Sequence, residues 1–338
     1  MMRTWVCAYA ALALCTAAPA KEPKPATPLF ASDTPIHVTI QGPMSSLASN
    51  RSATARAATM TVDGVTYPIT LTPRGITRLR KDTCEFPPLR VAFTQPPPAG
   101  SLFEHQKHLK LTVFCKKSPE FQQKILLEYS AYKLYNLMTP ESFRARLANV
   151  DYVDENGRPY ISRMSFFVED FSEVAKRNGM KQAHMGSLVP LAQIDPQAGA
   201  RFAIFEDMIA NHDWDMRAAP KGSECCHNAR LMSAAPGSPL LPVPYDFDYS
   251  GLVDAPYAIP PEQLQINDVR DRDYRGYCAH QEQARAIAAQ LSPRRAEFTG
   301  VFATIPGLEP REQAKAAAFI QGFFADLDSG KMLKSCVN

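Results

Sequence analysis

The hydrophobic pattern of the chain changes from strand-like to helical near residue 115, and this change limits the folds open to it. Between residues 36 and 114, short alternating or β-branched runs are separated by connections rich in Gly, Pro or Ser, which is the pattern of strands. The runs are HVTI at 37–40, TMTV at 59–62, YPITLT at 67–72, LRVAF at 89–93 and LKLTVF at 109–114. We therefore expect an antiparallel sheet in this half of the chain.

A long helix is expected directly after these strands, at 119–138. Apolar residues from Phe121 to Leu137 recur near helical spacing, and Ser118 is placed as an N-cap before Pro119 at the first helical position. The pattern predicts that this helix packs on the sheet.

The rest of the chain adds two strands and is otherwise expected to be largely helical. The strands are predicted at 147–153 and 161–168, joined by the turn-forming ENGRP. Helices are predicted at 201–210, 281–290 and 310–327. A chain of this length exceeds what one compact core usually holds. We expect an α+β protein with two lobes, a β-rich one at 36–168 and a helical one at 169–338.

The first twenty residues have the features of a cleaved signal peptide. Arg3 supplies a positive charge, an apolar run extends from Trp5 to Cys15, and Ala18 and Ala20 frame a cleavage site. The run is too short to span a bilayer. Cleavage after Ala20 is expected to leave a Pro/Ala-rich linker at 21–35 and to place the protein in the periplasm or outside the cell.

Six cysteines remain after removal of the leader, and an even number outside the cytosol predicts disulfides. They are Cys84, Cys115, Cys225, Cys226, Cys278 and Cys336. Spacing does not choose among their 15 possible connectivities.

Net charge and hydropathy each argue against one class of partner. The formal net charge of +3 gives no electrostatic argument for nucleic acid, and no later stretch is apolar enough for a stable membrane anchor.

The residues best suited to catalysis or metal binding lie in the segment 211–251. In PVPYDFDY, strand-like alternation puts Asp246 and Asp248 on one face, and two such carboxylates favour a hard cation between them. Asn228 offers an amide oxygen to the same ion, and Asp213 or Asp215 is placed to take a proton from a hydroxyl nucleophile. This combination is typical of phosphoryl transfer.

These segments resemble, in their order, the spore-coat CotH kinase-like proteins, atypical members of the protein-kinase fold. The matching segments are Asp213-Trp214-Asp215, His227-Asn228-Ala229-Arg230-Leu231 and Tyr245-Asp246-Phe247-Asp248, with Arg74-Gly75, Lys110-Leu111, a helix from Glu128 and Phe167-Val168-Glu169-Asp170 upstream. The resemblance implies a bilobal protein-kinase-like fold, with an antiparallel β lobe, one long helix and a mainly helical C-terminal lobe.

The resemblance also implies roles for particular residues. Asp215, or Asp213, would act on the acceptor hydroxyl, and Asn228, Asp246 and Asp248 would hold Mg²⁺ or Mn²⁺ on the phosphates of ATP. Nucleotide contacts would come from three residues of the N-terminal half. These are Lys110, its helix partner Glu128, and Glu169 at the hinge, with Lys107 and Lys124 as rivals of Lys110. The implied partners are a nucleotide and a hydroxyl acceptor, on a protein or on another molecule.

Departures from the family pattern keep other functions open. Asp213 replaces the usual histidine, and the β half contains no Gly-x-Gly-x-x-Gly loop, so a non-catalytic pseudokinase is one alternative. A metal-dependent hydrolase would use His212, Asp213, Asp215, His227 and Asp246 as ligands of Zn²⁺ or Mn²⁺. A disulfide-stapled binding protein would depend on bridges such as 84 with 115 and 225 or 226 with 278.

Overall fold

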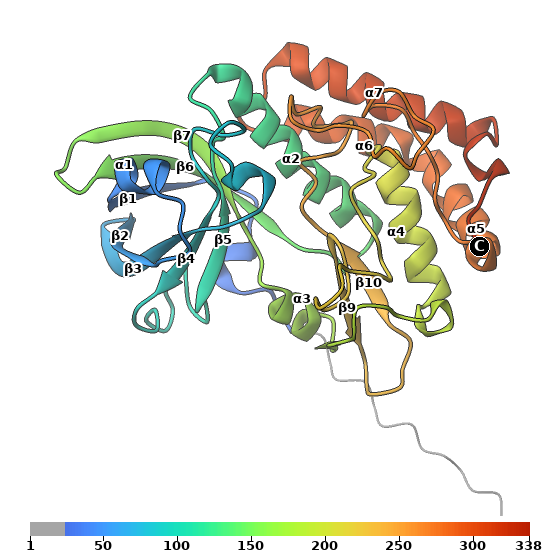
Figure 1. Cartoon of the computed structure of the whole chain (residues 1–338), viewed down its shortest axis with the longest axis horizontal. Coiled ribbons are helices and arrows are strands. Elements are labelled where there is room, and N and C mark those ends of the chain that lie inside the picture. Colours follow the sequence, from blue (N-terminus) through green and yellow to red (C-terminus); the bar gives the residue numbers. More distant parts are fainter. Residues whose placement is uncertain (1–23) are drawn as a thin grey trace, which may run out of the picture.

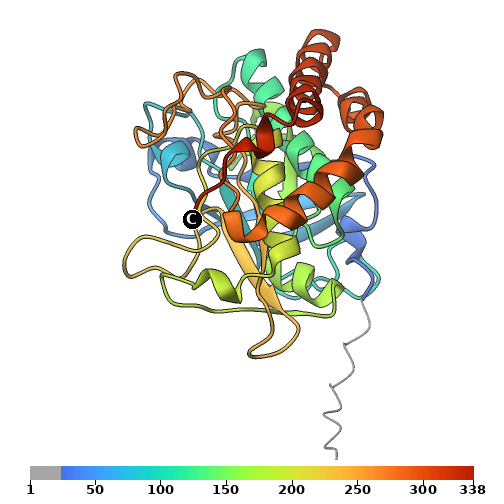
Figure 2. The same ribbon diagram turned by 90° about the vertical axis from the view of Figure 1, so that its right-hand side faces the viewer.

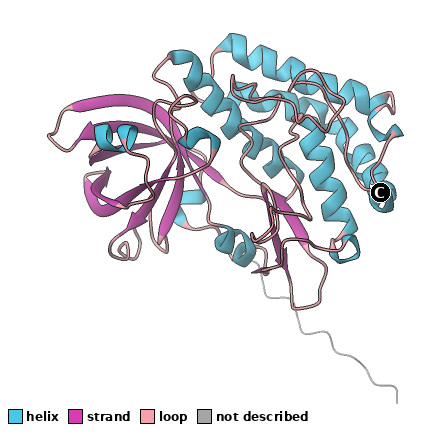
Figure 3. Cartoon of the chain, viewed as in Figure 1, coloured by secondary structure: helices cyan, strands magenta, loops and turns pink. Residues whose placement is uncertain are grey.

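A computed structural model describes residues 24–338 of the chain, so the predicted signal peptide lies outside the described residues. The N-terminal strands form a closed barrel in the order β1-β2-β3-β4-β5-β7-β6. The barrel occupies one end of the molecule in Figure 1 and is drawn in magenta in Figure 3. Its strands are β1 (Ile36–Gly42), β2 (Arg56–Val62), β3 (Val65–Pro73), β4 (Leu89–Phe93), β5 (His108–Thr112), β6 (Ala145–Asp154) and β7 (Pro159–Val168).

The predicted protein-kinase-like fold is wrong, because the strands close into a mixed seven-stranded barrel and do not form an antiparallel lobe. Closure depends on β6, which pairs antiparallel with β7 and parallel with β1, over seven residue pairs from Ile36 with Ala148 to Gly42 with Asp154. The alternating pattern correctly predicted seven strands. It could not predict closure, since alternation defines the two faces of a strand and not the partner on each edge.

The second half is not the helical lobe that the sequence suggested, because it includes a small sheet of order β10-β9-β8. Its strands are β8 (Lys181–Gln182), β9 (Ala229–Ser233) and β10 (Leu241–Pro244). Figure 2 shows this sheet among helices and long loops. The α-helices of the molecule are α1 (Met44–Ser49), α2 (Pro119–Met138), α3 (Phe171–Arg177), α4 (Pro196–Met208), α5 (Gln281–Leu291), α6 (Arg295–Gly300) and α7 (Pro310–Asp328).

Short 3₁₀ turns connect several of these elements, and two of them matter below. The first, η1 (Pro28–Phe30), lies within the predicted linker, and its Leu29 and Phe30 are buried in the barrel core. The second, η2 (Thr77–Leu79), follows β3 and faces the second half of the chain. The others are η3 (Leu191–Gln193), η4 (Cys278–His280), η5 (Ser292–Arg294), η6 (Val301–Thr304) and η7 (Met332–Lys334).

Helix α2 lies between the barrel and helices α4 to α7 (Figure 1) and is buried along most of its length. The sequence predicted its bounds, with Ser118 at the N-cap and Pro119 at the first helical position, although the Ser118 side chain makes no capping hydrogen bond. Because side chains alternate along β7, its two faces pack into two different hydrophobic cores. Phe167 points into the barrel core, and Phe166 packs on Tyr132 of α2, with ring centroids 5.7 Å apart.

Three disulfides connect the six cysteines predicted to pair. Cys84 pairs with Cys115, as one of the sequence-based alternatives had it. The suggested bridge from Cys225 or Cys226 to Cys278 is wrong, because Cys225 pairs with its neighbour Cys226 and Cys278 with Cys336. Within the described residues, no helix is long and apolar enough to cross a membrane.

Candidate active site

Arg78 of η2 is the centre of a buried charge cluster that joins the barrel to the second half of the chain. Its guanidinium makes a two-pronged ion pair with Glu128 of α2, at 2.9 and 3.2 Å. It also contacts Asp246 Oδ1 at 3.4 Å and Asp248 Oδ2 at 3.1 Å. One guanidinium therefore serves three carboxylates. The sequence analysis missed Arg78, because a lone arginine in a loop has no spacing pattern that marks it.

Asp246 and Asp248 come together for a reason other than the one predicted. Strand β10 ends at Pro244, and Asp246 has a φ of +67°, so the expected strand alternation does not extend to these carboxylates. Phe247 between them is fully buried against Tyr132, with ring centroids 4.7 Å apart. Burial of this ring leaves both acidic side chains facing Arg78. Where the sequence predicted a metal ion between them, the structure places a guanidinium.

The environments of these two carboxylates push their pKa values apart. Burial raises the pKa of Asp248 to about 8, against the opposing effect of Arg78, and the charges of Asp246 and Glu128 raise it further. Burial would also raise the pKa of Asp246, but Arg78, Arg74 and other nearby cations lower it below its ordinary value. At neutral pH, Asp246 is therefore the ionised member of the pair. Such a divergence is typical of sites that handle protons or charge.

Asp246 lies near further cations from the barrel side and the loop side. Lys110 of β5 and His227 both act on its pKa, together with Arg74 and Arg78. The Lys110 ammonium lies 4.5 Å from the centroid of the Tyr245 ring. Burial lowers the pKa of Lys110 to about 8, and the neighbouring charge of Arg74 contributes to this shift.

The β9–β10 hairpin brings Asn228 to the same end as Asp246. Pro244 pairs with Ala229, and the Tyr245 backbone N–H donates to the Asn228 carbonyl oxygen at 3.1 Å. Asn228, like Asp246, has a positive φ, of +49°. Non-glycine residues rarely adopt this conformation outside turns and functional sites. Two such residues therefore meet at one end of the small sheet.

Asp213 joins this group through side-chain hydrogen bonds. His227 Nε2 donates to Asp213 Oδ1 at 2.7 Å, because a carboxylate only accepts, and Asn228 Nδ2 donates to Asp213 Oδ2 at 2.9 Å. The hydrogen bond that His227 donates to Asp213 raises the pKa of His227, against the effect of its partial burial. The structure therefore assembles Asp213, His227, Asn228 and Asp246 from three separate segments.

Asp215, the favoured catalytic residue of the sequence analysis, holds a turn in the structure. Its Oδ1 accepts from the backbone N–H groups of Arg217 and Ala218, at 2.8 and 2.9 Å. Its backbone exchanges two hydrogen bonds with that of His227. Asp215 thus fixes the loop that carries His227, and Asp213 has the side chain in contact with the assembled group.

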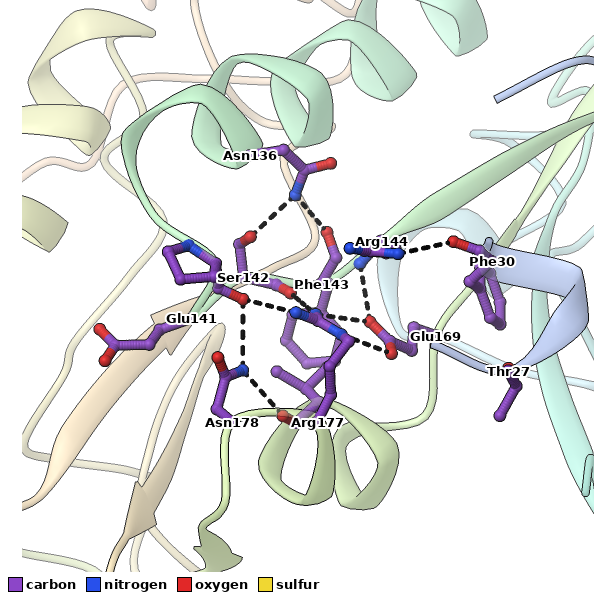
Figure 4. Close-up of polar contacts among 12 residues, drawn as sticks. Thr27, Phe30, Asn136, Glu141, Ser142, Phe143, Arg144, Glu169, Arg177 and Asn178 are labelled. Carbon is purple, nitrogen blue, oxygen red and sulfur yellow. Dashed lines mark hydrogen bonds and ion pairs between the residues drawn. The ribbon is translucent and has the colours of Figure 1, made fainter. Parts of the chain in front are cut away.

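Two predicted nucleotide contacts from the N-terminal half are engaged elsewhere. Glu128 pairs with Arg78 and not with Lys110. Glu169, at the end of β7, accepts from Arg177 on both of its oxygens and from the Arg144 backbone N–H at 3.0 Å. Figure 4 shows Arg177 reaching from α3 to Glu169 and to the backbone near Ser142. This arrangement indicates a structural role for Glu169.

The ligand set suggested for a metal hydrolase does not assemble. His212 is buried, and its Nε2 contacts the Asp271 carbonyl oxygen at 2.8 Å. Among residues 24–338, no group of three or more His, Cys, Asp or Glu side chains is arranged to hold a metal ion. A cation at this site would need ligands from a bound substrate.

Two of the disulfides brace the candidate site. Cys84 follows the turn that carries Arg78, and Cys115 precedes the helix that carries Glu128, so their bridge ties together the two segments of the buried ion pair. The bridge between Cys225 and Cys226 lies directly before His227.

Compared with known proteins, the chain matches no protein-family model and no curated protein sequence.

Proposed function

We propose that the chain is an exported phosphotransferase, which moves the terminal phosphoryl group of metal-bound ATP to a hydroxyl acceptor. The observation that carries the proposal is that Asp246, in contact with the buried Arg78, lies at the same end of the small sheet as Asn228, which with His227 holds the Asp213 carboxylate. Phosphoryl transfer needs positioning and charge neutralisation more than covalent help from the protein. The proposal rests on this site and requires no protein-kinase-like fold.

Lys110 and Arg74 are the proposed phosphate contacts. Both lie close enough to Asp246 to influence its ionisation. Arg78 is buried and already serves three carboxylates, so it positions Asp246 and does not bind the phosphates itself. A lysine acts on phosphates as a point charge, and an arginine adds directed hydrogen bonds.

The residues present fit a cation that arrives with the nucleotide. Mg²⁺ commonly uses one or two protein carboxylates and completes its shell with phosphate oxygens and water. Asp246 supplies an ionised carboxylate, of which Oδ1 contacts Arg78. Asn228 donates through its amide nitrogen to Asp213, so its amide oxygen is the atom offered to a cation. Asp246 and Asn228 would therefore hold Mg²⁺ or Mn²⁺, which would neutralise phosphate charge.

Asp213 is the proposed acceptor of the hydroxyl proton. Its carboxylate is about one-third exposed and is held in place by His227 and Asn228. Its local partners keep its orientation fixed, as a proton acceptor requires. Asp215 instead accepts from backbone N–H groups of its own turn, so Asp213 is the acid whose side chain contacts His227 and Asn228.

Export is part of the proposal and is supported by three disulfides and by the N-terminal sequence pattern. In an oxidising compartment, the bridges that brace Arg78 and His227 persist. The periplasm and the extracellular space both meet this condition.

The test is thermal unfolding of the purified protein with ATP and Mg²⁺, with ATP and a chelator, and with Mg²⁺ alone. A ligand present at 100 times its Kd adds about 2.7 kcal/mol to the free energy of unfolding. We expect the melting temperature to rise by several degrees with Mg²⁺ and ATP together. The variant Asp246→Asn should lose this rise. Asp63→Asn, in the β2–β3 turn, is the matched control and should keep it.

An equal rise in the wild type and in Asp246→Asn would show that the nucleotide does not bind at this site, and no rise in the wild type would refute the proposal. Transfer is then measured with γ-labelled ATP and a mixed protein acceptor. Binding of the nucleotide without transfer would indicate a non-catalytic nucleotide-binding protein and would contradict the phosphotransferase assignment.

A further inference from the structure

A cavity of about 240 Å³ lies beside Asp213 and is separate from the charge cluster around Arg78. Its walls come from the loop that follows α4, from Tyr249 and from the irregular segment between residues 251 and 277. Asp213, Tyr249, Glu262 and Val269 line it together with the run from Ile259 to Pro261.

The volume of this cavity limits its occupant. An apolar cavity of about 150 Å³ in another protein is sufficient to bind benzene, so one substituted aromatic ring fits here. Pockets that enclose drug-sized ligands are larger, at about 300–1,000 Å³. A whole nucleotide would therefore exceed the cavity. The cavity suits the acceptor side of the reaction and not the donor side.

The lining of the cavity favours an aromatic ring. Ile259, Pro260, Pro261 and Val269 present apolar surface, and Tyr249 contributes an aromatic side chain. Ile259 is 70% exposed, so its apolar side chain is accessible to a ligand. A ring seated in the cavity would cover this surface.

Asp213 supplies the polar wall that distinguishes a ring with a hydroxyl from a plain ring. Its two oxygens already accept from His227 and Asn228. A carboxylate has about four lone-pair sites, so it can accept one more donor. The nearby Glu262 adds a second carboxylate to the lining, which further favours a ligand that donates hydrogen bonds over one that carries negative charge.

We propose that this cavity is the acceptor subsite and that it takes a phenolic ring whose hydroxyl donates to Asp213. As an acceptor assignment, this rests on the proposed function. In the transfer step, the phenolic oxygen forms a bond to the terminal phosphorus of the nucleoside triphosphate. The bond from that phosphorus to the bridging oxygen breaks, and the nucleoside diphosphate leaves with the electron pair. The phenolic proton moves to the Asp213 carboxylate. The phenol is either a small molecule or the tyrosine side chain of a polypeptide.

Binding is measured by calorimetry on the full mature chain without nucleotide, so that it does not depend on the proposed transfer. The probes are p-cresol and N-acetyl-tyrosinamide, and N-acetyl-serinamide is the hydroxyl control without a ring. We expect p-cresol to bind, and the serine compound not to bind. Binding of N-acetyl-tyrosinamide as well identifies a polypeptide source, and binding of p-cresol alone identifies a small phenol.

The matched variants change one exposed apolar residue at a time. Ile259→Asp should weaken phenol binding at least tenfold, and Ile259→Leu should retain it. Val65→Asp, in an exposed position at the start of β3, should leave binding unchanged. No binding by either phenol, or equal binding by wild type and Ile259→Asp, would overturn the subsite. Phenol binding without any nucleotide effect on melting would support the subsite and refute the proposed function.

Discussion

The Arg78 guanidinium and the Glu128 carboxylate form a fully buried, two-pronged ion pair, with N–O distances of 2.9 and 3.2 Å. This pair links the turn after β3 to helix α2, and both of these segments lie next to the candidate site. Because the pair also orients Asp246 and Asp248, its integrity affects both stability and the site.

Replacement of Arg78 by methionine should destabilise the protein strongly. Removal of one partner from a buried ion pair typically costs about 3–5 kcal/mol, because the other charge is left without compensation. Urea unfolding of the variant measures this loss. Arg80→Met is the control. Arg80 forms an exposed pair with Asp82, so its replacement should not measurably change the urea midpoint. Equal midpoints for the wild type and Arg78→Met would contradict the buried pair.

Asp248→Asn should change the dependence of stability on pH. The folded-state pKa of Asp248 is about 8, above its unfolded value, so between about pH 4 and pH 8 the folded protein binds the extra proton. Its contribution to stability is complete below pH 4 and is lost as the pH rises through 8. The wild type should therefore lose stability relative to the variant over this range, by at most about 1.4 kcal/mol per pH unit. Parallel profiles from urea unfolding at pH 5, 6.5 and 8 would show that this carboxyl does not carry the shift.

His227 should titrate above the ordinary histidine range, because its ring donates to Asp213. Nuclear magnetic resonance of the His227 ring protons measures its pKa directly. The variant Asp213→Asn should lower that pKa, since it removes the negative charge and keeps the shape. The charged pair stabilises the fold at low pH, and this contribution disappears as the pH rises through the folded-state pKa. His184, which is exposed, is the internal control and should be unaffected by the substitution.

Removal of the bridge between Cys84 and Cys115 should lower the free energy of unfolding by about 3–4 kcal/mol. The bridge closes a segment with a sequence separation of 31, and the estimate follows from the chain entropy that such a closure removes from the unfolded state. Cys84→Ala with Cys115→Ala is compared with the wild type in urea. The double variant should also weaken any nucleotide-induced rise in melting temperature, because the bridge holds Arg78 near Glu128. A double variant as stable as the wild type would show that the bridge constrains neither state.

The candidate site was predictable in part. Asp246, Asp248, Asn228 and Asp213 stand out because acidic and amide side chains are concentrated in one segment, and the structure brings them to one place. Arg78 was not predictable, since it meets Asp246 across 168 residues of sequence. Its guanidinium lies where a metal ion was expected, because a buried cationic side chain can compensate the same pair of carboxylates.

By itself, the sequence determined the local structure: seven barrel strands, the bounds of α2 and the three longer later helices follow from apolar periodicity and capping residues, which act over a few residues. Only the tertiary structure decided that β1 joins β6 to close the barrel, that Cys278 pairs with Cys336, and that Glu128 faces Arg78 and not Lys110. These choices depend on contacts between segments far apart in the chain, and periodicity carries no information about which distant edge, thiol or charge becomes the partner.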